Sequence, residues 1–231
     1  MSIEEGASFI LNERTNDQLS RLQGYLSMLG VEVVEGSASS EELAYLQLYA
    51  ADQRVRRIGE IGFNAGISSC ALLEANANAE VISFDIGEHD CVSPAKAFID
   101  REYPGRHILI KGDSTKTVPA FHNQNPSVWF DFLFIDGGHA YEVVRADLLN
   151  GQLLSKPETT LIIDDLVPWI PYGRGPTRAW EELRQAGVVV QDELVQEGMV
   201  VRKLHPPGMR AWARGRYGQK TIPLQGMDIA S

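Results

Sequence analysis

From Arg54 onward, short apolar runs alternate with stretches of helical spacing, and this alternation limits the possible folds more than any other feature. It predicts strand–helix units and a mainly parallel sheet. We therefore expect a doubly wound α/β fold with a seven-stranded sheet that ends in an antiparallel hairpin. The expected strands are Val55–Ile61, Glu80–Asp85, His107–Lys111, Phe130–Ile135 and Thr160–Asp164, followed by the hairpin strands Val188–Val195 and Met199–Leu204.

The chain length and the segments outside this pattern indicate the domain organisation. Two stretches, residues 7–29 and 41–51, partly follow helical spacing and should form helices before the sheet. A length of 231 residues suffices for one α/β domain with additions. We expect N-terminal helices over residues 1–53 that form a lid or a dimer contact, a catalytic domain over 54–205 and a basic tail over 206–231.

Composition limits the partners. A net charge of −10 argues against a long nucleic-acid footprint. No apolar run approaches the roughly 20 residues that a membrane span needs, and the first residues lack the features of a signal peptide. The two cysteines, Cys70 and Cys91, are expected to be reduced. These features predict a cytoplasmic protein with neither nucleic acid nor a membrane as its partner.

A loop with two glycines follows the first expected strand, in the segment Glu60-Ile61-Gly62-Phe63-Asn64-Ala65-Gly66. Glycine lets backbone approach a ligand closely, and the free N–H groups of the helix that follows favour a carboxylate. The loop lacks the dinucleotide fingerprint G-x-G-x-x-G and the Lys-Ser/Thr ending of a P-loop. It predicts a nucleotide site of another kind, although a tight turn without a ligand explains the loop equally well.

Acidic residues close the next two expected strands. Asp85 ends the second strand, where a carboxylate can accept hydrogen bonds from two ribose hydroxyls. Asp113, with Ser114, ends the third strand, where it can accept a hydrogen bond from an adenine amino group. The alternatives are a turn or helix cap for Asp85 and a helix N-cap for Asp113. Three successive strand ends thus carry the groups that one adenosyl ligand needs.

The segment from Glu60 to Gly66, Asp85, Gly112-Asp113-Ser114 and Phe134-Ile135-Asp136-Gly137-Gly138-His139 together resemble the class I S-adenosylmethionine methyltransferases. The sequence is most similar to the group of catechol and caffeoyl-CoA O-methyltransferases, from about Glu35 to Leu204. The resemblance implies a Rossmann-like methyltransferase fold. It places Gly62, Asn64, Gly66 and Ser68 around the methionine part of the cofactor, Asp85 at the ribose and Asp113 with Ser114 at the adenine, and it adds Glu60, Phe63 and Asp136 to the cofactor site.

Three carboxylates follow the fourth and fifth strands: Asp136, Asp164 and Asp165. Adjacent strands of a parallel sheet end at the same edge, so these side chains can converge on Mg²⁺, which would lower the pKa of a substrate hydroxyl. The resembling enzymes carry an acid–amide pair after the fifth strand, so Asp165 departs from their pattern and leaves the identity of the metal open. The alternative is that Asp164 and Asp165 cap a loop and hold Arg174 or Arg178.

His139 lies three residues beyond Asp136, at the offset where catechol O-methyltransferases place a catalytic lysine. An imidazole with its ordinary pKa can take a hydroxyl proton at neutral pH. The sequence is similar in this respect to macrocin-type sugar O-methyltransferases, which use histidine for the step. We expect His139 and Asp136 to be catalytic, and an ordinary polar loop residue is the alternative for His139.

The loop after the acidic pair carries candidates for substrate recognition. Trp169 and Tyr172 could stack on a planar acceptor, and Arg174 could pair with a carboxylate or phosphate. Packing against the N-terminal helices is the alternative for Trp169.

Together these features predict an O-methyltransferase that uses S-adenosylmethionine and a divalent metal, Mg²⁺, on a small molecule with adjacent oxygens, catechol-like or sugar-like. A homodimer is one expected assembly. Three alternatives stay open: an N- or C-methyltransferase of the same fold without metal, a cofactor-binding module without catalysis, and a nicotinamide dehydrogenase. The missing third glycine and the terminal hairpin disfavour the dehydrogenase.

Overall fold

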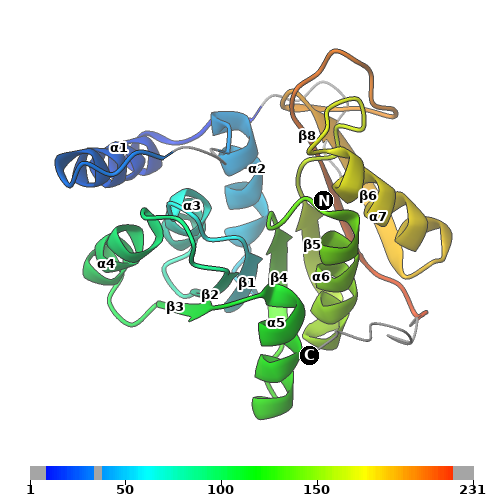
Figure 1. Ribbon diagram of the computed structural model, residues 1–231, viewed down its shortest axis with the longest axis horizontal. Helices are drawn as coiled ribbons and strands as arrows, with labels where there is room; N and C mark the ends of the chain where they lie inside the picture. The colour runs from blue at the N-terminus through cyan, green and yellow to red at the C-terminus, as the bar shows by residue number, and fades with distance from the viewer. Residues whose placement is uncertain (1–8, 34–37, 221–231) are drawn as a thin grey trace.

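The computed structural model describes residues 9–33 and 38–220, which form a mainly parallel sheet with helices on both faces (Figure 1). This arrangement confirms the doubly wound α/β fold. The helices are α1 (Glu13–Met28), α2 (Ser40–Ala50), α3 (Ile67–Ala75), α4 (Val92–Glu102), α5 (Ser114–Gln124), α6 (Tyr141–Leu153) and α7 (Arg174–Gln185). The strands are β1 (Arg57–Ile61), β2 (Glu80–Asp85), β3 (His107–Lys111), β4 (Phe130–Ile135), β5 (Ser155–Ile163), β6 (Val189–Gln196), β7 (Met199–Val200) and β8 (Ala211–Tyr217).

The strands lie in the order β3-β2-β1-β4-β5-β8-β6-β7. The first five are parallel, β8 is antiparallel to both β5 and β6, and β7 is antiparallel to β6. The chain order reverses between β1 and β4, which creates a switch point where open α/β sheets bind ligands at the carboxyl ends of their strands. The sheet therefore has eight described strands, one more than the seven expected.

The end of the sheet differs from the expected hairpin. Strand β7 holds only two residues, and the long partner of β6 is β8, in the segment expected to be a basic tail. Arg214 of β8 pairs with Asp192 and Glu193 of β6, at N–O distances of 3.2 and 3.1 Å. Basic residues of this segment thus join two strands of the sheet. Residues 221–231 lie outside the described residues.

Strand β4 shows how the sheet separates two hydrophobic cores. Its side chains alternate between the faces, as the period of a strand requires. Phe132 and Phe134 belong to a cluster with α1, α2, α3 and α4, whereas Leu133 and Ile135 belong to a second cluster with α5, α6 and α7. All four are almost completely buried, and each contributes on the order of 1.5–3 kcal/mol of burial free energy.

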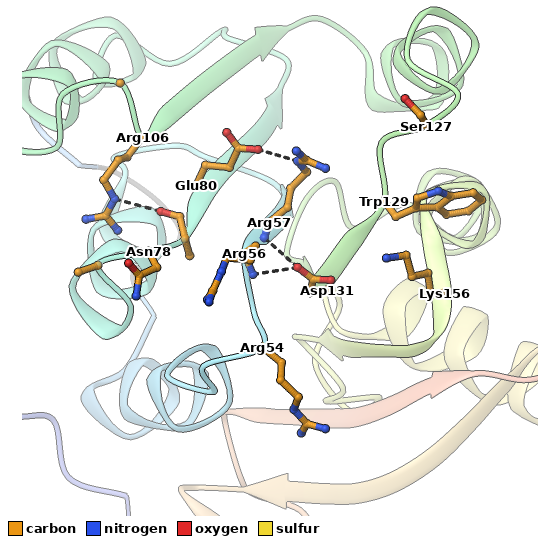
Figure 2. A pocket seen from close by; sticks show the side chains of 13 residues that line it. Arg54, Arg56, Arg57, Asn78, Glu80, Arg106, Ser127, Trp129, Asp131 and Lys156 are labelled. Atoms are coloured by element: carbon orange, nitrogen blue, oxygen red, sulfur yellow. Dashed lines mark hydrogen bonds and ion pairs between the residues drawn. The ribbon is translucent and has the colours of Figure 1, made fainter.

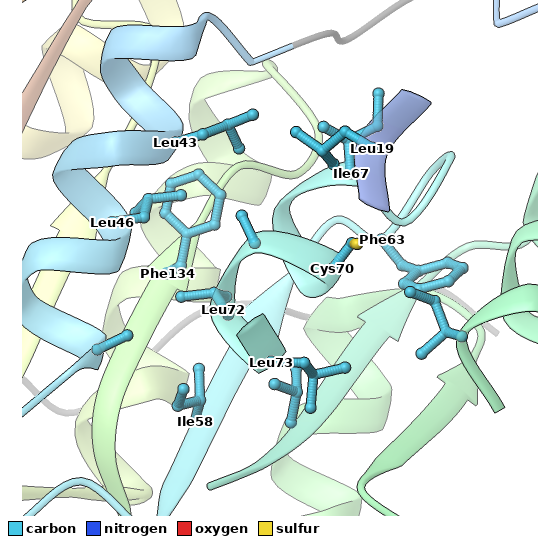
Figure 3. Close-up of a cluster of buried hydrophobic side chains, with 14 of the residues drawn as sticks. Leu19, Leu43, Leu46, Ile58, Phe63, Ile67, Cys70, Leu72, Leu73 and Phe134 are labelled. Atoms are coloured by element: carbon cyan, nitrogen blue, oxygen red, sulfur yellow. The ribbon is translucent and has the colours of Figure 1, made fainter. Parts of the chain in front are cut away.

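The two helices expected before the sheet are present as α1 and α2. On α2, Leu43 and Leu46 lie beside Phe134 of β4 (Figure 3). The buried Tyr45 donates a hydrogen bond to Glu193 of β6 at 2.7 Å. These contacts fix α2 against the half of the sheet that follows the switch point.

Among the residues that the structure describes, no helix is both long enough and apolar enough to cross a bilayer. Cys70 and Cys91 are free thiols in buried positions, in agreement with the expectation that they are reduced.

Candidate functional site

The loop after β1 comes into backbone contact with the loop after β4. Gly62 has a φ of +97°, and a Cβ atom there would lie 1.9 Å from the carbonyl oxygen of Asp136. Its N–H donates to the carbonyl of Phe84 at 2.8 Å. Only glycine fits this position, since both the left-handed backbone and the close approach exclude a side chain. The two loops thereby form one continuous wall.

Asp85 shapes this loop from the end of β2. One carboxylate oxygen accepts hydrogen bonds from the backbone N–H groups of Phe63 and Asn64, at 2.8 and 2.9 Å. The other oxygen accepts from the N–H of Gly87 at 2.7 Å. The turn role foreseen as an alternative is therefore present. The ribose role stays a prediction, and the oxygen that accepts from Gly87 has a further lone pair for a hydroxyl.

Glu60 lies beneath the loop, completely buried, and takes no part in lining the cavity. Its carboxylate accepts hydrogen bonds from the hydroxyls of Ser68, Ser69 and Ser83. Burial raises the pKa of Glu60, and the three hydroxyl donors oppose that shift. Glu60 therefore anchors the start of α3, and the direct contact with the cofactor that the sequence predicted stays a prediction.

A cavity of about 480 Å³ opens above these loops at the carboxyl ends of the strands. Gly66, expected around the methionine part of the cofactor, does not line it and instead begins α3 with a φ of +71°. Apart from Glu60 and Gly66, the residues expected at the cofactor site all line the cavity, together with His139: Gly62, Phe63, Asn64, Ser68, Asp85, Asp113, Ser114, Asp136 and His139.

Asp113 caps the helix that follows β3, as the alternative interpretation foresaw. Its carboxylate accepts hydrogen bonds from the hydroxyl and the N–H of Thr115, at 2.6 and 3.0 Å, which lower the pKa of Asp113. The residue is half-buried and lines the cavity. A cap and an adenine contact are compatible, because Thr115 engages one carboxylate oxygen and, among the described residues, the other has only the ammonium group of Lys116 nearby, at 3.5 Å.

Two carboxylates and one imidazole meet at the end of the cavity. Oxygen atoms of Asp136 and Asp165 and a ring nitrogen of His139 all lie within 4.8 Å of one another. The Nε2 atom of His139 is 2.8 Å from an oxygen of Asp165, which adopts a left-handed φ of +61°. The structure therefore joins two of the three expected metal ligands with the expected base.

The third expected ligand, Asp164, has a partner that the sequence analysis missed. Its carboxyl group shares a hydrogen bond with the carboxyl group of Glu42, which enters from α2 and is 1% exposed. Burial raises the pKa of Asp164 to about 7, and it also raises the pKa of Glu42. Burial, reinforced by the carboxylates of Asp164 and Asp165, raises the pKa of Asp136. Four acidic side chains therefore lie close together at the carboxyl edge of the sheet.

The expected substrate residues fall in different places. Trp169 donates a hydrogen bond to the carbonyl of Gly208 at 2.6 Å and packs against the second hydrophobic cluster, so it is a packing residue and does not line the cavity. The ring centroid of Tyr172 lies 5.6 Å from that of His139. Arg174 is exposed at the first residue of α7. Only Tyr172 contacts a predicted catalytic residue.

A second hollow, of about 590 Å³, opens at the amino ends of the strands (Figure 2). It is rich in arginine, but the guanidinium groups there are engaged within the protein. Arg57 pairs with Glu80 at 2.6 Å, and Arg106 donates to the carbonyl oxygen of Ala79 at 3.0 Å. The carboxylate of Asp131 accepts hydrogen bonds from two backbone N–H groups.

Known proteins resemble this chain in sequence over its central part. Residues 60–166 match the family Methyltransf_24, a methyltransferase domain. The O-methyltransferase hkm8 of Aspergillus hancockii is 27% identical over 164 residues, which cover 69% of this chain and 62% of that protein. The match thus spans less than two thirds of that relative.

Solved structures share the fold over nearly the whole chain. The O-methyltransferase from Bacillus cereus, solved with SAH (S-adenosylhomocysteine), has a TM-score of 0.68 at 20% identity and covers 87% of this chain and 90% of its own. TomG from Streptomyces achromogenes, an O-methyltransferase solved with SAM (S-adenosylmethionine), has a TM-score of 0.68 at 17% identity, with coverages of 91% and 92%. The resemblance expected from the motifs is confirmed. Residues 60–166 are therefore similar to a methyltransferase domain, and the chain has the Rossmann-like fold of solved O-methyltransferases.

Proposed function

We propose that this protein transfers the methyl group of S-adenosylmethionine to a hydroxyl of a small molecule with adjacent oxygens, catechol-like or sugar-like, with the help of Mg²⁺. One observation carries the proposal. The cavity lined by the glycine loop and Asp85 continues without interruption to Asp136 and His139, so the cofactor groups and the proton acceptor share one space. The family match favours this cofactor over a nicotinamide.

The cavity fits the cofactor in size and lining. Its volume lies within the range of small-molecule sites. The absence of a side chain at Gly62 leaves the backbone open to a ligand, Asp85 offers oxygen to hydroxyl groups, and Asp113 offers oxygen to an amino group. When bound, the cofactor supplies an electrophilic sulfonium methyl group.

The acidic edge fits a divalent cation. Asp136 and Asp165 offer hard oxygen ligands close to His139. Burial, together with the neighbouring carboxylates, raises the pKa values of Asp136 and Asp164, and a bound cation would offset both effects. A cation held by these residues would lower the pKa of a substrate hydroxyl.

His139 performs the proton transfer in this proposal. It accepts the hydroxyl proton, the oxygen forms a bond to the methyl carbon, and the carbon–sulfur bond breaks to leave the neutral thioether. Asp165 holds the imidazole at 2.8 Å and stabilises the imidazolium that forms. The ring of Tyr172 lies beside the imidazole.

A second candidate is methyl transfer without a metal. The contact between His139 and Asp165 favours it, because a carboxylate that orients an imidazole can let it activate a hydroxyl without a metal. In that case Asp136 only orients the acceptor. Activity that survives a chelator would select this candidate.

Binding and turnover assays test the proposal together. Calorimetry with S-adenosylhomocysteine should detect binding, and turnover on a panel of catechols and diols should require Mg²⁺ and cease with EDTA. His139→Ala should slow methyl transfer by about 10²- to 10⁴-fold and leave cofactor affinity nearly unchanged. The absence of binding heat, with and without Mg²⁺, would refute the function as a whole.

We also propose that the acceptor is a small molecule rather than nucleic acid and that the N-terminal helices form a lid or a homodimer contact. The exposed apolar side chains of Ile10, Met28 and Leu29, at 86%, 87% and 53%, support a contact there. Light scattering of the purified protein tests the dimer.

A further inference from the structure

The carboxyl group of Glu42 is buried without the partners that a buried charge requires. Glu42 is 1% exposed, and its Oε1 atom has no hydrogen-bond partner. Its other contact is the hydrogen bond with Asp164, so the side chain is directed into the acidic edge. A fully buried glutamate beside other acids destabilises a fold unless positive charge compensates it.

Helix α2 holds Glu42 in place independently of any ligand. Ser39 caps the helix by accepting a hydrogen bond from the N–H of Glu42 at 3.1 Å. One turn further along, the hydroxyls of Tyr45 and Tyr49 both donate to Glu193 of β6 at 2.7 Å. Figure 1 shows α2 between α3 and the end of the sheet formed by β5, β8 and β6. These contacts hold α2 so that the carboxyl group of Glu42 lies beside Asp164.

Positive charge near this edge is limited. Arg210, whose charge acts on Asp164, is exposed, and the imidazole of His139 lies beside Asp165. The carboxylates of Asp164, Asp136 and Asp165 all raise the energy of a charge on Glu42. A divalent cation at this edge would relieve the repulsion among all four acids.

We infer that Glu42 is a positioning residue of the divalent cation site and joins the N-terminal helices to it. One oxygen of Glu42 fixes the carboxyl group of Asp164, and the unpartnered Oε1 adds negative charge and an acceptor for water bound to the ion. This inference rests on the proposed metal-assisted function.

Titration calorimetry with MgCl₂ tests the inference on the whole chain saturated with S-adenosylhomocysteine. Glu42→Gln keeps the volume and a hydrogen-bonding group while removing the charge, and it should weaken Mg²⁺ binding by about 10- to 100-fold. Glu41→Gln is the matched control, because Glu41 is the exposed neighbour in the same turn of α2. The control should bind Mg²⁺ like the wild type.

A second measurement separates this role from a merely structural one. Without metal, Glu42→Gln should leave the melting temperature nearly unchanged, because the amide keeps the volume of the side chain and can still donate a hydrogen bond to Asp164. It should also leave the affinity for S-adenosylhomocysteine unchanged. A residue that only packs α2 would lower the melting temperature when substituted.

The outcomes distinguish this inference from the proposed function. If the wild type binds Mg²⁺ and Glu42→Gln binds it equally tightly, the role of Glu42 is refuted and the metal-assisted function stands. If the wild type binds no Mg²⁺, the proposed metal dependence fails, and the inference fails with it.

Discussion

The two edges of the sheet differ in whether their charged side chains have partners of opposite charge. At the amino edge, shown in Figure 2, arginines lie beside acids or carbonyl oxygens, and the Arg57–Glu80 pair is one-third exposed on both sides. At the carboxyl edge, like charges gather in and around a cavity, and Glu42 leaves one oxygen without a partner. Paired exposed charges stabilise a fold weakly, whereas crowded buried acids destabilise it. A protein retains such crowding where a ligand relieves it.

Strand β4 offers the sharpest test of this difference, because it carries an aspartate at each edge. Asp136→Asn should reduce turnover by at least about 10²-fold and weaken Mg²⁺ binding, because it removes a charged oxygen ligand. Asp131→Asn at the amino edge should leave turnover unchanged, since an amide oxygen still accepts from the N–H groups of Arg56 and Arg57. Steady-state kinetics on both variants measures the contrast. Equal losses would remove the functional distinction between the edges.

Glycines with positive φ provide a second test. Gly62→Ala should cost at least about 3 kcal/mol, because strain adds to a clash with the backbone of Asp136. Gly105→Ala, beside the hollow at the amino edge, should cost about 1 kcal/mol, because its φ is +75° but no atom lies within 4 Å of the added Cβ. Urea unfolding measures both values. Similar costs would contradict the close crossing of the two loops.

The dependence of stability on pH should have opposite signs at the two edges. The raised pKa of Asp164, about 7 against an ordinary 3.8, means that the folded protein binds more protons than the unfolded chain. Without metal, stability should therefore fall as the pH rises from about 4 to 7. The hydrogen bonds from Arg54 lower the pKa of Asp52 to about 2, so its small contribution is present above pH 4 and lost toward pH 2.

Thermal melts in EDTA between pH 4 and 8 measure this dependence. Asp164→Asn should reduce the fall in melting temperature, and Asp52→Asn should not. Part of the fall should persist in Asp164→Asn, because burial also raises the pKa of Asp147 to about 7. A wild-type melting temperature that rises steadily through this range would contradict the crowding of acids at the carboxyl edge.

The smallest expected effect concerns the exposed ion pair at the amino edge. Arg57→Ala should lower stability by at most about 1 kcal/mol, or about 2–4 °C in melting temperature, because both partners are partly solvated. Turnover and cofactor affinity should not change. A marked loss of cofactor affinity would show that the two edges are coupled.

The central strands were predictable because strong local signals delimit them. The apolar runs of β2, β3 and β4 begin and end as expected from the sequence. Strand β8 escaped prediction because Ala211–Tyr217 mixes alanine, glycine and arginine, residues of low strand propensity. Its place comes from pairing with β5 and β6, and the half-buried Arg214 pairs with acidic residues of β6.

The candidate site was predictable where it follows strand ends and unpredictable where helices contribute. Asp85, Asp113, Asp136 and His139 line one cavity, as parallel strand ends require. Glu42 sits in a local pattern typical of a capping box, in which the glutamate folds back to its own helix end. In the structure, the N–H of Glu42 donates to the hydroxyl of Ser39, as in a capping box. The carboxyl group of Glu42, however, contacts Asp164 instead of its own helix end.

The insertion of β8 between β5 and β6 has a consequence for synthesis on the ribosome. The N–H of Leu166, directly after the acidic pair, donates to the carbonyl of Ala211 at 2.7 Å. A nascent chain exposes the glycine loop, and then the two aspartates, well before residues 211–217 emerge. The amino-terminal half can therefore collapse early. The loop that bears Asp165 becomes fixed only after β8, the last described strand, has paired with β5.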